Sequence, residues 1–310
     1  MSDAHVVLGT GAIGLALVDE LVASGRSVRA VNRSGRADVP AGVEVRAGDL
    51  TDSAFAGGAL AGAAVVYQCL NPPYHRWAEE FPGLQHAAVR AARANGARFV
   101  SFENTYMYGD TNGEPMTEST PMRAHTRKGK VRAAMAEQLR TLHKSGDLRV
   151  STARASDYFG PRGTAQSPFG DLVIGAALAG KAARVMGDPD QPHSYTYTAD
   201  AARTLAALGT RDDVDGEVFH VPNAPALTTR QIIDVISEQL GSPIKVSTAP
   251  RLLLRALGLF NPTVRELDEM RYEFTQPFIV DSTKAQNRLD IAPTPLREAL
   301  QATIAWFRTQ

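Results

Sequence analysis

Short apolar runs alternate with segments of helical periodicity through the first half of the chain. The apolar runs predict strands at residues 6–8, 28–32, 43–47, 65–70, 98–102 and 149–154. The segments between them predict helices at residues 15–23, 82–95 and 130–142. This alternation indicates an α/β fold, in which helices cover both faces of a parallel sheet and the crossovers are right-handed.

After Gly160 and Pro161 the pattern is looser and indicates a smaller second unit. We predict helices at residues 168–180, 198–208, 228–240 and 295–307, and strands at residues 217–221 and 244–246. Thr228 is the expected N-cap of the third of these helices. An apolar segment at residues 252–259 predicts a further helix that covers the core, with a pocket wall or a dimer contact as alternatives.

The first predicted strand ends in Gly9-Thr10-Gly11-Ala12-Ile13-Gly14, which leads into the first predicted helix. A strand, a Gly-x-Gly-x-x-Gly turn and a helix in this order are typical of a Rossmann-type dinucleotide site. The first glycine permits the turn, the second lets a pyrophosphate approach the backbone, and the third lets the helix pack closely. The N–H groups at the start of the helix then face the phosphates, so we predict that these six residues bind a dinucleotide.

The end of the second predicted strand indicates which dinucleotide binds. An acidic side chain at this place binds the ribose 2′-hydroxyl of NAD, whereas an arginine accommodates the 2′-phosphate of NADP. The chain has Asn32-Arg33-Ser34 there and no carboxylate. Arg33 is suited to clamp a phosphate and Ser34 to donate to it, so NADP(H) is favoured over NAD(H). Asp49 is a candidate to meet the adenine or to form a turn, and Leu50 and Leu70 complete the predicted cofactor-binding residues.

Composition excludes several classes of function. Lys and Arg number 33 against 33 Asp and Glu, so no basic field favours a nucleic-acid partner. No apolar run is long enough to span a bilayer, and residues 1–5 do not resemble a signal peptide. The one cysteine, Cys69, excludes an internal disulfide and favours a cytoplasmic location. The histidines lack metal-ligand spacing, so no metal is expected.

Five stretches carry a resemblance to a known family: the glycine motif, Gly48–Asp52, Tyr108–Asp110, Phe159–Arg162 and Tyr197–Asp200. With them the chain resembles an extended short-chain dehydrogenase/reductase of the NAD-dependent epimerase/dehydratase type. The resemblance implies a nicotinamide cofactor and a doubly wound parallel sheet of about seven strands. It places the sheet in residues 1–160 with returning segments near 194–222 and 278–284. It also implies a smaller, discontinuous C-terminal α/β substrate domain in residues 161–310, and it leaves a homodimer open.

The chain departs from this family at the usual catalytic pair. Such enzymes carry Ser or Thr after the fifth strand and Tyr-x-x-x-Lys at the start of the next helix, where the tyrosine transfers a proton and the lysine lowers its pKa. Counting along the motifs places Asn104 at the Ser/Thr position. It places Gly129 and Ala133 at the Tyr and Lys positions. No Tyr-x-x-x-Lys occurs in the chain, so the resemblance predicts an atypical member.

The loop after the fifth predicted strand supplies other candidates for catalysis. Tyr106 is the predicted acid, and Asn104 is predicted to orient a substrate oxygen. Lys130 takes the lysine position if the helix slips by one turn. It or Lys128 is then expected to lower a phenol pKa, with contact to solvent or phosphate as the alternative. For Tyr106 and Tyr108, a structural role with hydrogen-bonded hydroxyls also stays open.

These features predict an NADP-dependent oxidoreductase, reductase-like or epimerase/dehydratase-like, that acts on a small polar carbonyl or enone substrate. Reduction is easier to reconcile with the sequence than sugar epimerisation, because reversible oxidation needs a strong base. The alternative is a non-catalytic NADP(H)-binding sensor that regulates a partner, since fold alone does not fix function.

Overall fold

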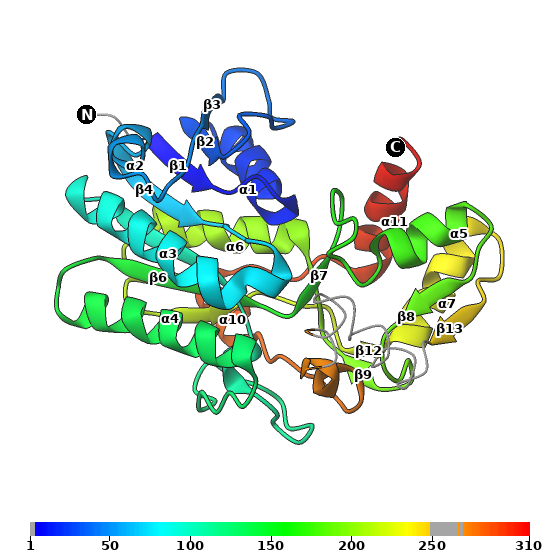
Figure 1. Cartoon of the computed structure of the whole chain (residues 1–310). Coiled ribbons are helices and arrows are strands. Elements are labelled where there is room, and N and C mark those ends of the chain that lie inside the picture. The colour runs from blue at the N-terminus through cyan, green and yellow to red at the C-terminus, as the bar shows by residue number, and fades with distance from the viewer. Residues whose placement is uncertain (1–3, 249–265, 267–268) are drawn as a thin grey trace.

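A parallel sheet of seven strands lies at the centre of the protein (Figure 1). The computed structural model describes residues 4–248, 266 and 269–310. The strand order is β11-β6-β5-β4-β1-β2-β3. The strands are β1 (Ala4–Leu8), β2 (Val28–Asn32), β3 (Glu44–Ala47), β4 (Ala63–Gln68), β5 (Arg98–Asn104), β6 (Val150–Ala155) and β11 (Val218–His220). Every neighbouring pair is parallel, which confirms the predicted α/β fold and strand number.

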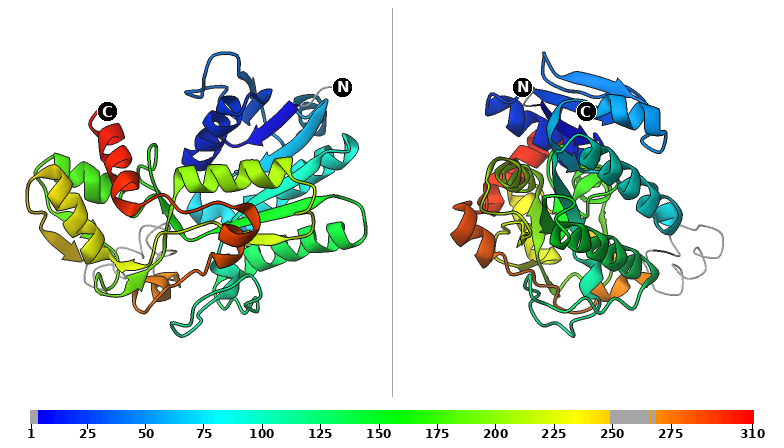
Figure 2. Two further views of the ribbon diagram at one scale, coloured as in Figure 1. Left: turned by 180° about the vertical axis from the view of Figure 1, so that it is seen from behind. Right: turned by 90° about the vertical axis from the view of Figure 1, so that its left-hand side faces the viewer.

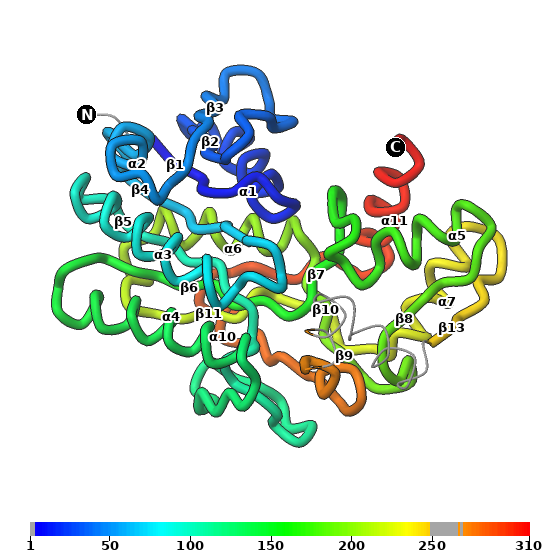
Figure 3. Tube along the Cα trace, viewed as in Figure 1, coloured from blue at the N-terminus to red at the C-terminus, as the bar shows by residue number. Residues whose placement is uncertain are grey.

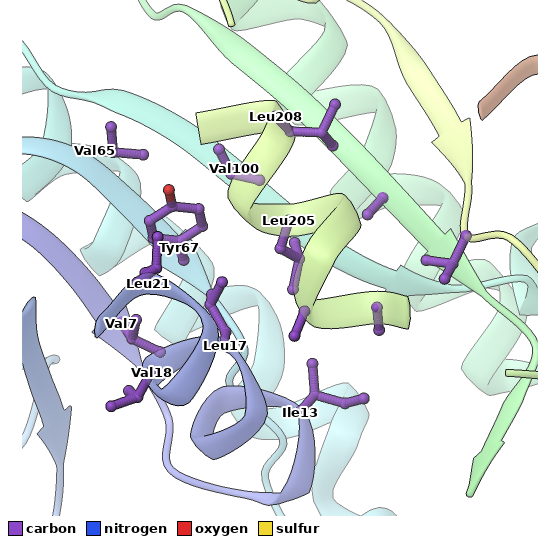
Figure 4. Packing of buried hydrophobic residues seen from close by; sticks show 14 of the residues in the cluster. Val7, Ile13, Leu17, Val18, Leu21, Val65, Tyr67, Val100, Leu205 and Leu208 are labelled. Atoms are coloured by element: carbon purple, nitrogen blue, oxygen red, sulfur yellow. The ribbon is translucent and has the colours of Figure 1, made fainter. Parts of the chain in front are cut away.

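Helices cover both faces of this sheet (Figure 2). One face carries α1 (Ala12–Ala23) and α6 (Thr198–Thr210), and the other carries α2 (Ser53–Ala59), α3 (Trp77–Ala94) and α4 (Arg127–Lys144). Figure 4 shows the first of the two cores, in which Leu17 and Leu205 point from the two helices toward the sheet. Both side chains are fully buried, so this core fixes α1 and α6 side by side.

The helix predicted from residue 82 begins five residues earlier, at Trp77, after the 3-10 turn η1 (Tyr74–Arg76). Trp77 and Phe81 are one helical turn apart and both are buried, so their packing outweighs the proline that follows. Pro82 lies inside the helix on its exposed side, where its missing N–H removes one backbone hydrogen bond. The prediction of this boundary was therefore wrong because tertiary packing overrode a helix-breaking signal.

Segments after β6 build a second, smaller group of elements (Figure 3). Its elements are β7 (Asp157–Phe159), η3 (Gly170–Gly175), α5 (Ala176–Leu178), β8 (Ala183–Val185), β9 (Pro192–His193), β12 (Leu227–Thr228), α7 (Thr229–Leu240), β13 (Val246–Thr248) and α11 (Leu296–Phe307). Thr228 caps α7 as predicted, because its Oγ1 accepts from Gln231 N at 3.1 Å. The helix predicted at residues 168–180 instead contains a π-helical turn at residues 170–175. The helix predicted at residues 252–259 lies outside the described residues.

The chain returns to the large sheet between these segments. β10 (Tyr195–Tyr197) pairs with β7 and leads directly into α6 and then β11. Later, η4 (Arg271–Phe274) and α10 (Thr283–Leu289) bring residues 271–289 back toward the sheet, where Lys284 bonds the Val218 carbonyl on β11. Among the described helices, none is both long and apolar enough to cross a membrane.

We expect Gly209→Ala to destabilise the protein. Gly209 lies at the end of α6, and a Cβ there would be 1.8 Å from the hydroxyl oxygen of the buried Tyr67. Overpacking of this kind costs about 1–3 kcal/mol of unfolding free energy, which urea denaturation measures. Gly57→Ala in α2 is the control, because no atom of the described residues lies within 4 Å of its Cβ position. That variant should gain up to about 1 kcal/mol, and equal stabilities for the two variants would contradict this packing.

Candidate active site

The glycine motif forms a tight turn between β1 and α1 at the carboxyl edge of the sheet. Gly9 has a φ of +95°, and a Cβ there would lie 2.6 Å from the Cys69 carbonyl oxygen. A Cβ at Gly14 would lie 1.9 Å from the Gly9 carbonyl oxygen, so only glycine allows this approach of helix and strand. No atom lies within 4 Å of a Cβ position at Gly11 among the described residues, and no side chain caps α1. The N–H groups of its first turn are therefore available to an anion.

The end of β2 presents an amide and a guanidinium instead of a carboxylate. Asn32 is held in place, since its Nδ2 donates to Thr10 Oγ1 at 2.7 Å and its Oδ1 accepts from Gly35 N at 2.6 Å. Arg33 and Ser34 are exposed, and Arg33 forms no ion pair in the part of the chain that the structure describes. The charge of Arg33 also lowers the pKa of the Asp49 carboxyl, so an anion beside this loop would meet a guanidinium that already has a carboxylate in its neighbourhood.

Asp49, Leu50 and Leu70 follow β3 and β4 at the same edge. Asp49 accepts from the backbone N and the hydroxyl of Thr51, at 2.9 and 2.8 Å, and these bonds lower the pKa of its carboxyl. Leu50 is buried in the core. The Leu70 backbone N lies 3.1 Å from the Cβ position of Gly9, so this residue borders the glycine turn.

The first turn of α4 contains Gly129 between two lysines, Lys128 and Lys130. A Cβ at Gly129 would lie 2.5 Å from the Tyr106 carbonyl oxygen, so no larger side chain fits this backbone. Lys130 is exposed, whereas Lys128 is buried. Lys128 Nζ donates to Glu266 Oε2 at 2.6 Å and to the Tyr74 carbonyl at 2.7 Å. The buried lysine of this turn is therefore Lys128, and its contacts tie α4 to the loop after β4 and to the C-terminal part.

Three aromatic side chains gather where β4 and β5 end. Trp77 contacts both Tyr74 and Tyr106, whose ring centroids lie 5.3 and 5.9 Å from that of Trp77. Burial raises the pKa of both phenols, and each phenol also affects the pKa of the other. Asn104 Oδ1 accepts from Tyr106 N at 3.4 Å, so Asn104 holds the turn that presents Tyr106. The structure therefore brings the predicted acid and Asn104 together, with Tyr74 as an additional hydroxyl.

Asp157 and Glu273 lie close enough to affect these phenols electrostatically, and His193 contacts both residues. His193 Nδ1 donates to the Glu273 backbone carbonyl at 3.1 Å, and its Nε2 lies 3.0 Å from Asp157 Oδ2. Glu273 is 1% exposed, and neither of its carboxyl oxygens has a hydrogen-bond partner in the described structure. Burial and the charge of Asp157 raise the pKa of this carboxyl. The neighbouring Tyr272 hydroxyl opposes that shift.

A second buried network links β5, β6 and β11. Arg154 donates from Nε to Glu103 Oε2 at 3.0 Å and from Nη1 to the Tyr108 hydroxyl at 2.9 Å. The Tyr108 hydroxyl lies 2.7 Å from His220 Nε2, and His220 Nδ1 lies 2.8 Å from the Asp281 carbonyl. Since a carbonyl only accepts, Nδ1 carries the proton and the Tyr108 hydroxyl donates to Nε2. The bonds of Tyr108 thus favour the structural role that the sequence left open.

Sequence reasoning did not select Tyr74 or Glu273. Tyr74 directly follows Pro72 and Pro73 after a predicted strand. A residue that follows the carboxyl end of a parallel strand is a candidate for a ligand site, and this position could have identified Tyr74 from the sequence. Nothing in the local pattern distinguishes Glu273, because its burial depends on contacts such as the one with His193, 80 positions away in the chain.

Comparison with known proteins identifies the family. The model of the NAD dependent epimerase/dehydratase family matches residues 6–221, which is more than half of the chain. The chain belongs to this family. Members similar to it include a dTDP-glucose 4,6-dehydratase of Streptomyces griseus, 24% identical over 73% of this chain and 63% of that protein. A UDP-glucose 4-epimerase of Mycolicibacterium smegmatis is 24% identical over 97% of this chain and 96% of its own length. The alignment thus spans less than two thirds of the dehydratase but nearly all of the epimerase.

Solved structures agree with this family assignment at the level of the fold. The structure of MoeE5 in complex with UDP-glucose and NAD superposes with a TM-score of 0.78, at 23% identity and 99% coverage of both chains. A UDP-N-acetylglucosamine 4-epimerase of Methanobrevibacter ruminantium, in complex with UDP-N-acetylmuramic acid, gives a TM-score of 0.81 at 20% identity, with both chains fully covered.

We expect His220 to make the protein less stable as the pH falls below about 6.5. Burial lowers the pKa of His220 below its ordinary value of 6.5, so below that pH the unfolded chain binds protons more readily than the folded one. The free energy of unfolding therefore decreases as the pH falls. His220→Gln should weaken this dependence between about pH 7 and pH 5 in urea unfolding. The exposed His86, changed to Gln, should keep the wild-type slope, and an unchanged slope in the His220 variant would contradict the assignment.

Proposed function

We propose that the protein is an NADP(H)-dependent oxidoreductase that acts on a small polar substrate with a carbonyl, or the corresponding alcohol, at the reacting carbon. The observation that carries this proposal is the shared edge of the sheet. The glycine turn after β1, the phenols after β4 and β5, and Asp157 after β6 all follow carboxyl ends of neighbouring parallel strands. In such sheets ligands bind outside these ends, so nucleotide and substrate would meet there.

The residues at the glycine turn fit a dinucleotide. The open backbone at Gly11 and the uncapped start of α1 suit a pyrophosphate, and Leu70 borders the same turn. Asn32, Arg33 and Ser34 would lie toward the adenosine ribose, and Asp49 toward the adenine. When bound, the nicotinamide group supplies or accepts a hydride. Arg33, which is exposed and forms no ion pair among the described residues, supports NADP(H) over NAD(H).

Hydride transfer to a carbonyl requires a proton for the oxygen, and Tyr106 is the group that we assign to this step. Counting along the motifs puts Gly129 and Ala133 at the positions of the family's usual pair, so we assign the proton transfer to another group. Tyr106 is half-buried, and its hydroxyl keeps its proton at neutral pH because burial raises its pKa. Asn104 would hold Tyr106 and the substrate oxygen, and Lys128 fits the buried cation position better than the exposed Lys130.

The raised phenol pKa values also suit the alternative, a non-catalytic NADP(H) sensor, since such phenols are poor bases. Titration with NADPH and NADH, read by thermal shift, tests whether the nucleotide site works. Turnover is then measured with a panel of ketones, enones and a sugar nucleotide such as UDP-glucose. Binding without turnover on any member would favour the sensor, and no binding would exclude both functions. A cytoplasmic location and a homodimer remain predictions.

Arg33→Asp should weaken NADPH binding by roughly 10- to 100-fold and leave NADH binding equal or stronger. The change removes a charged hydrogen-bond donor, worth about 1.5–3 kcal/mol, and places a repelling carboxylate beside the 2′-phosphate. Isothermal calorimetry with both nucleotides measures the two affinities. Arg26→Asp is the matched control, since Arg26 is exposed and lies before β2, at the opposite edge of the sheet. Unchanged NADPH affinity in the Arg33 variant would refute the clamp.

Tyr106→Phe should lower kcat by about 10²- to 10⁴-fold with little change in cofactor affinity, because it removes the proton donor and keeps the ring that packs on Trp77. The measurement is steady-state turnover on the substrate found in the panel. Tyr67→Phe, which removes a hydroxyl buried in the core beneath α6, controls for the loss of a phenol as such. Wild-type turnover in the Tyr106 variant would exclude Tyr106 as the acid.

A further inference from the structure

The loop that follows β7, residues 160–167, contacts elements of the nucleotide-binding part, and we call it the strap. Figure 1 shows it beside α1, where Arg162 Nη1 donates to Asp19 Oδ2 at 2.6 Å. The Nη2 atom of the same guanidinium lies 3.6 Å from Asp38 Oδ2, in the loop between β2 and β3. The first anchor of the strap therefore attaches it to α1 and to the loop that carries Arg33.

The second anchor attaches the strap to the loop after β4. Gln166 Oε1 accepts from Asn71 Nδ2 and from the Tyr158 hydroxyl, each at 3.1 Å. Asn71 is itself held in place, because its Oδ1 accepts from Trp77 Nε1 at 3.1 Å. Asn71 directly follows Leu70, the residue that borders the glycine turn. This anchor therefore lies next to the proposed nucleotide site.

The two anchors lie on two elements that meet at the glycine turn. The helix α1 begins there, and the loop after β4 borders it. Four residue steps separate Arg162 from Gln166, so their Cα atoms are at most about 14 Å apart. The strap between the anchors therefore passes close to the carboxyl edge at which the turn lies. A dinucleotide bound at the turn would have to pass the strap as it enters or leaves.

The ends of the strap are fixed by packing. A Cβ at Gly160 would lie 2.0 Å from Thr198 Oγ1 at the start of α6, so the strap begins in close contact with that helix. Phe169, just beyond the other end, is fully buried in the core of the second group of elements. In the described structure the backbone hydrogen bonds of residues 163–167 stay within the loop. The strap is thus a preformed unit that the side chains of Arg162 and Gln166 attach to the nucleotide-binding part.

The first anchor is easily broken. Arg162 has a φ of +65°, a conformation that residues other than glycine rarely adopt. Its two partners are open to solvent, since the side chains of Asp19 and Asp38 are 44% and 93% exposed. Ion pairs at such exposure are weak, and segments held by few buried contacts open at low cost. The strap is therefore able to open while its packed ends stay in place.

We propose that the strap is a gate for the dinucleotide, and that the Arg162–Asp19 and Gln166–Asn71 anchors set the rates of its entry and release. The inference rests on the dinucleotide binding proposed above. Both anchors join protein groups to one another and not to the nucleotide. Their loss therefore lowers the barrier for entry and the barrier for release alike, and leaves the equilibrium affinity nearly unchanged. A residue that only contacts the bound nucleotide would alter release alone.

Stopped-flow fluorescence with NADPH tests the gate. Asp19→Asn and Gln166→Ala should each raise both kon and koff by about 3- to 10-fold and leave the Kd within about twofold of wild type. Glu20→Gln is the matched control for Asp19, because it removes the same charge from the next residue of α1. Gln191→Ala is the control for Gln166, because it removes an exposed side-chain hydrogen bond in another loop. Both controls should keep the wild-type rates.

Two results would overturn the gate although NADPH binds: wild-type rates in both anchor variants, or a rise in koff alone. The second result would mean that the anchors only stabilise the bound state. Absence of NADPH binding by the wild type would overturn the proposed function, and the gate with it.

Trypsin cleavage after Arg162 follows the opening of the strap without any nucleotide. The guanidinium must leave Asp19 before it can enter the protease, so Asp19→Asn should be cut there about 3- to 10-fold faster than the wild type and Glu20→Gln. Mass spectrometry of the fragments identifies the site. Equal cleavage rates in the three proteins would overturn the role of the first anchor, whatever the nucleotide affinity.

Discussion

The close approach of α1 to β1 is the contact on which the rest of the structure depends. The glycines of the turn bring the helix start against the end of the strand, where even one methyl group at Gly14 would collide with the Gly9 carbonyl. This packing aims the first turn of α1 at the carboxyl edge of the sheet. Because every strand of the sheet runs parallel, the loops after β4, β5 and β6 emerge at the same edge. The glycine turn and the polar cluster are thus neighbours because all strands of the sheet run in the same direction.

Charge compensation is the second constraint. The interior near this edge contains several ionisable groups, and a low dielectric makes each uncompensated charge costly. Arg154 with Glu103 and Lys128 with Glu266 meet that cost by pairing. Tyr108 and His220 avoid this cost because they are neutral groups that form a hydrogen bond with each other. Two buried groups depart from this pattern in the described structure: the Glu273 carboxyl has no hydrogen-bond partner, and the Arg132 guanidinium bonds only the Phe102 carbonyl.

The sequence was sufficient for the features that depend on local chemistry. Apolar runs predicted the main strands, the glycine spacing predicted the turn at Gly9–Gly14, and the polar residue before a helical segment predicted the cap at Thr228. The sequence did not predict the features that depend on contacts between residues far apart in the chain. The start of α3 depends on the burial of Trp77 and Phe81, and the inward orientation of Lys128 depends on Glu266, 138 positions away in the chain. Local patterns carry no information about such partners.

The order of these parts along the chain separates two properties of the site. The glycine turn and all seven strands of the sheet precede residue 221, whereas Glu266 and Glu273 follow it. Substitutions in the later segment therefore alter the groups around Tyr106 and leave the sequence of the glycine turn unchanged. The segment that forms the glycine turn and the segment that supplies the groups around Tyr106 are therefore free to change in sequence at different rates. This independence offers a physical route by which a single nucleotide-binding frame comes to serve unlike reactions.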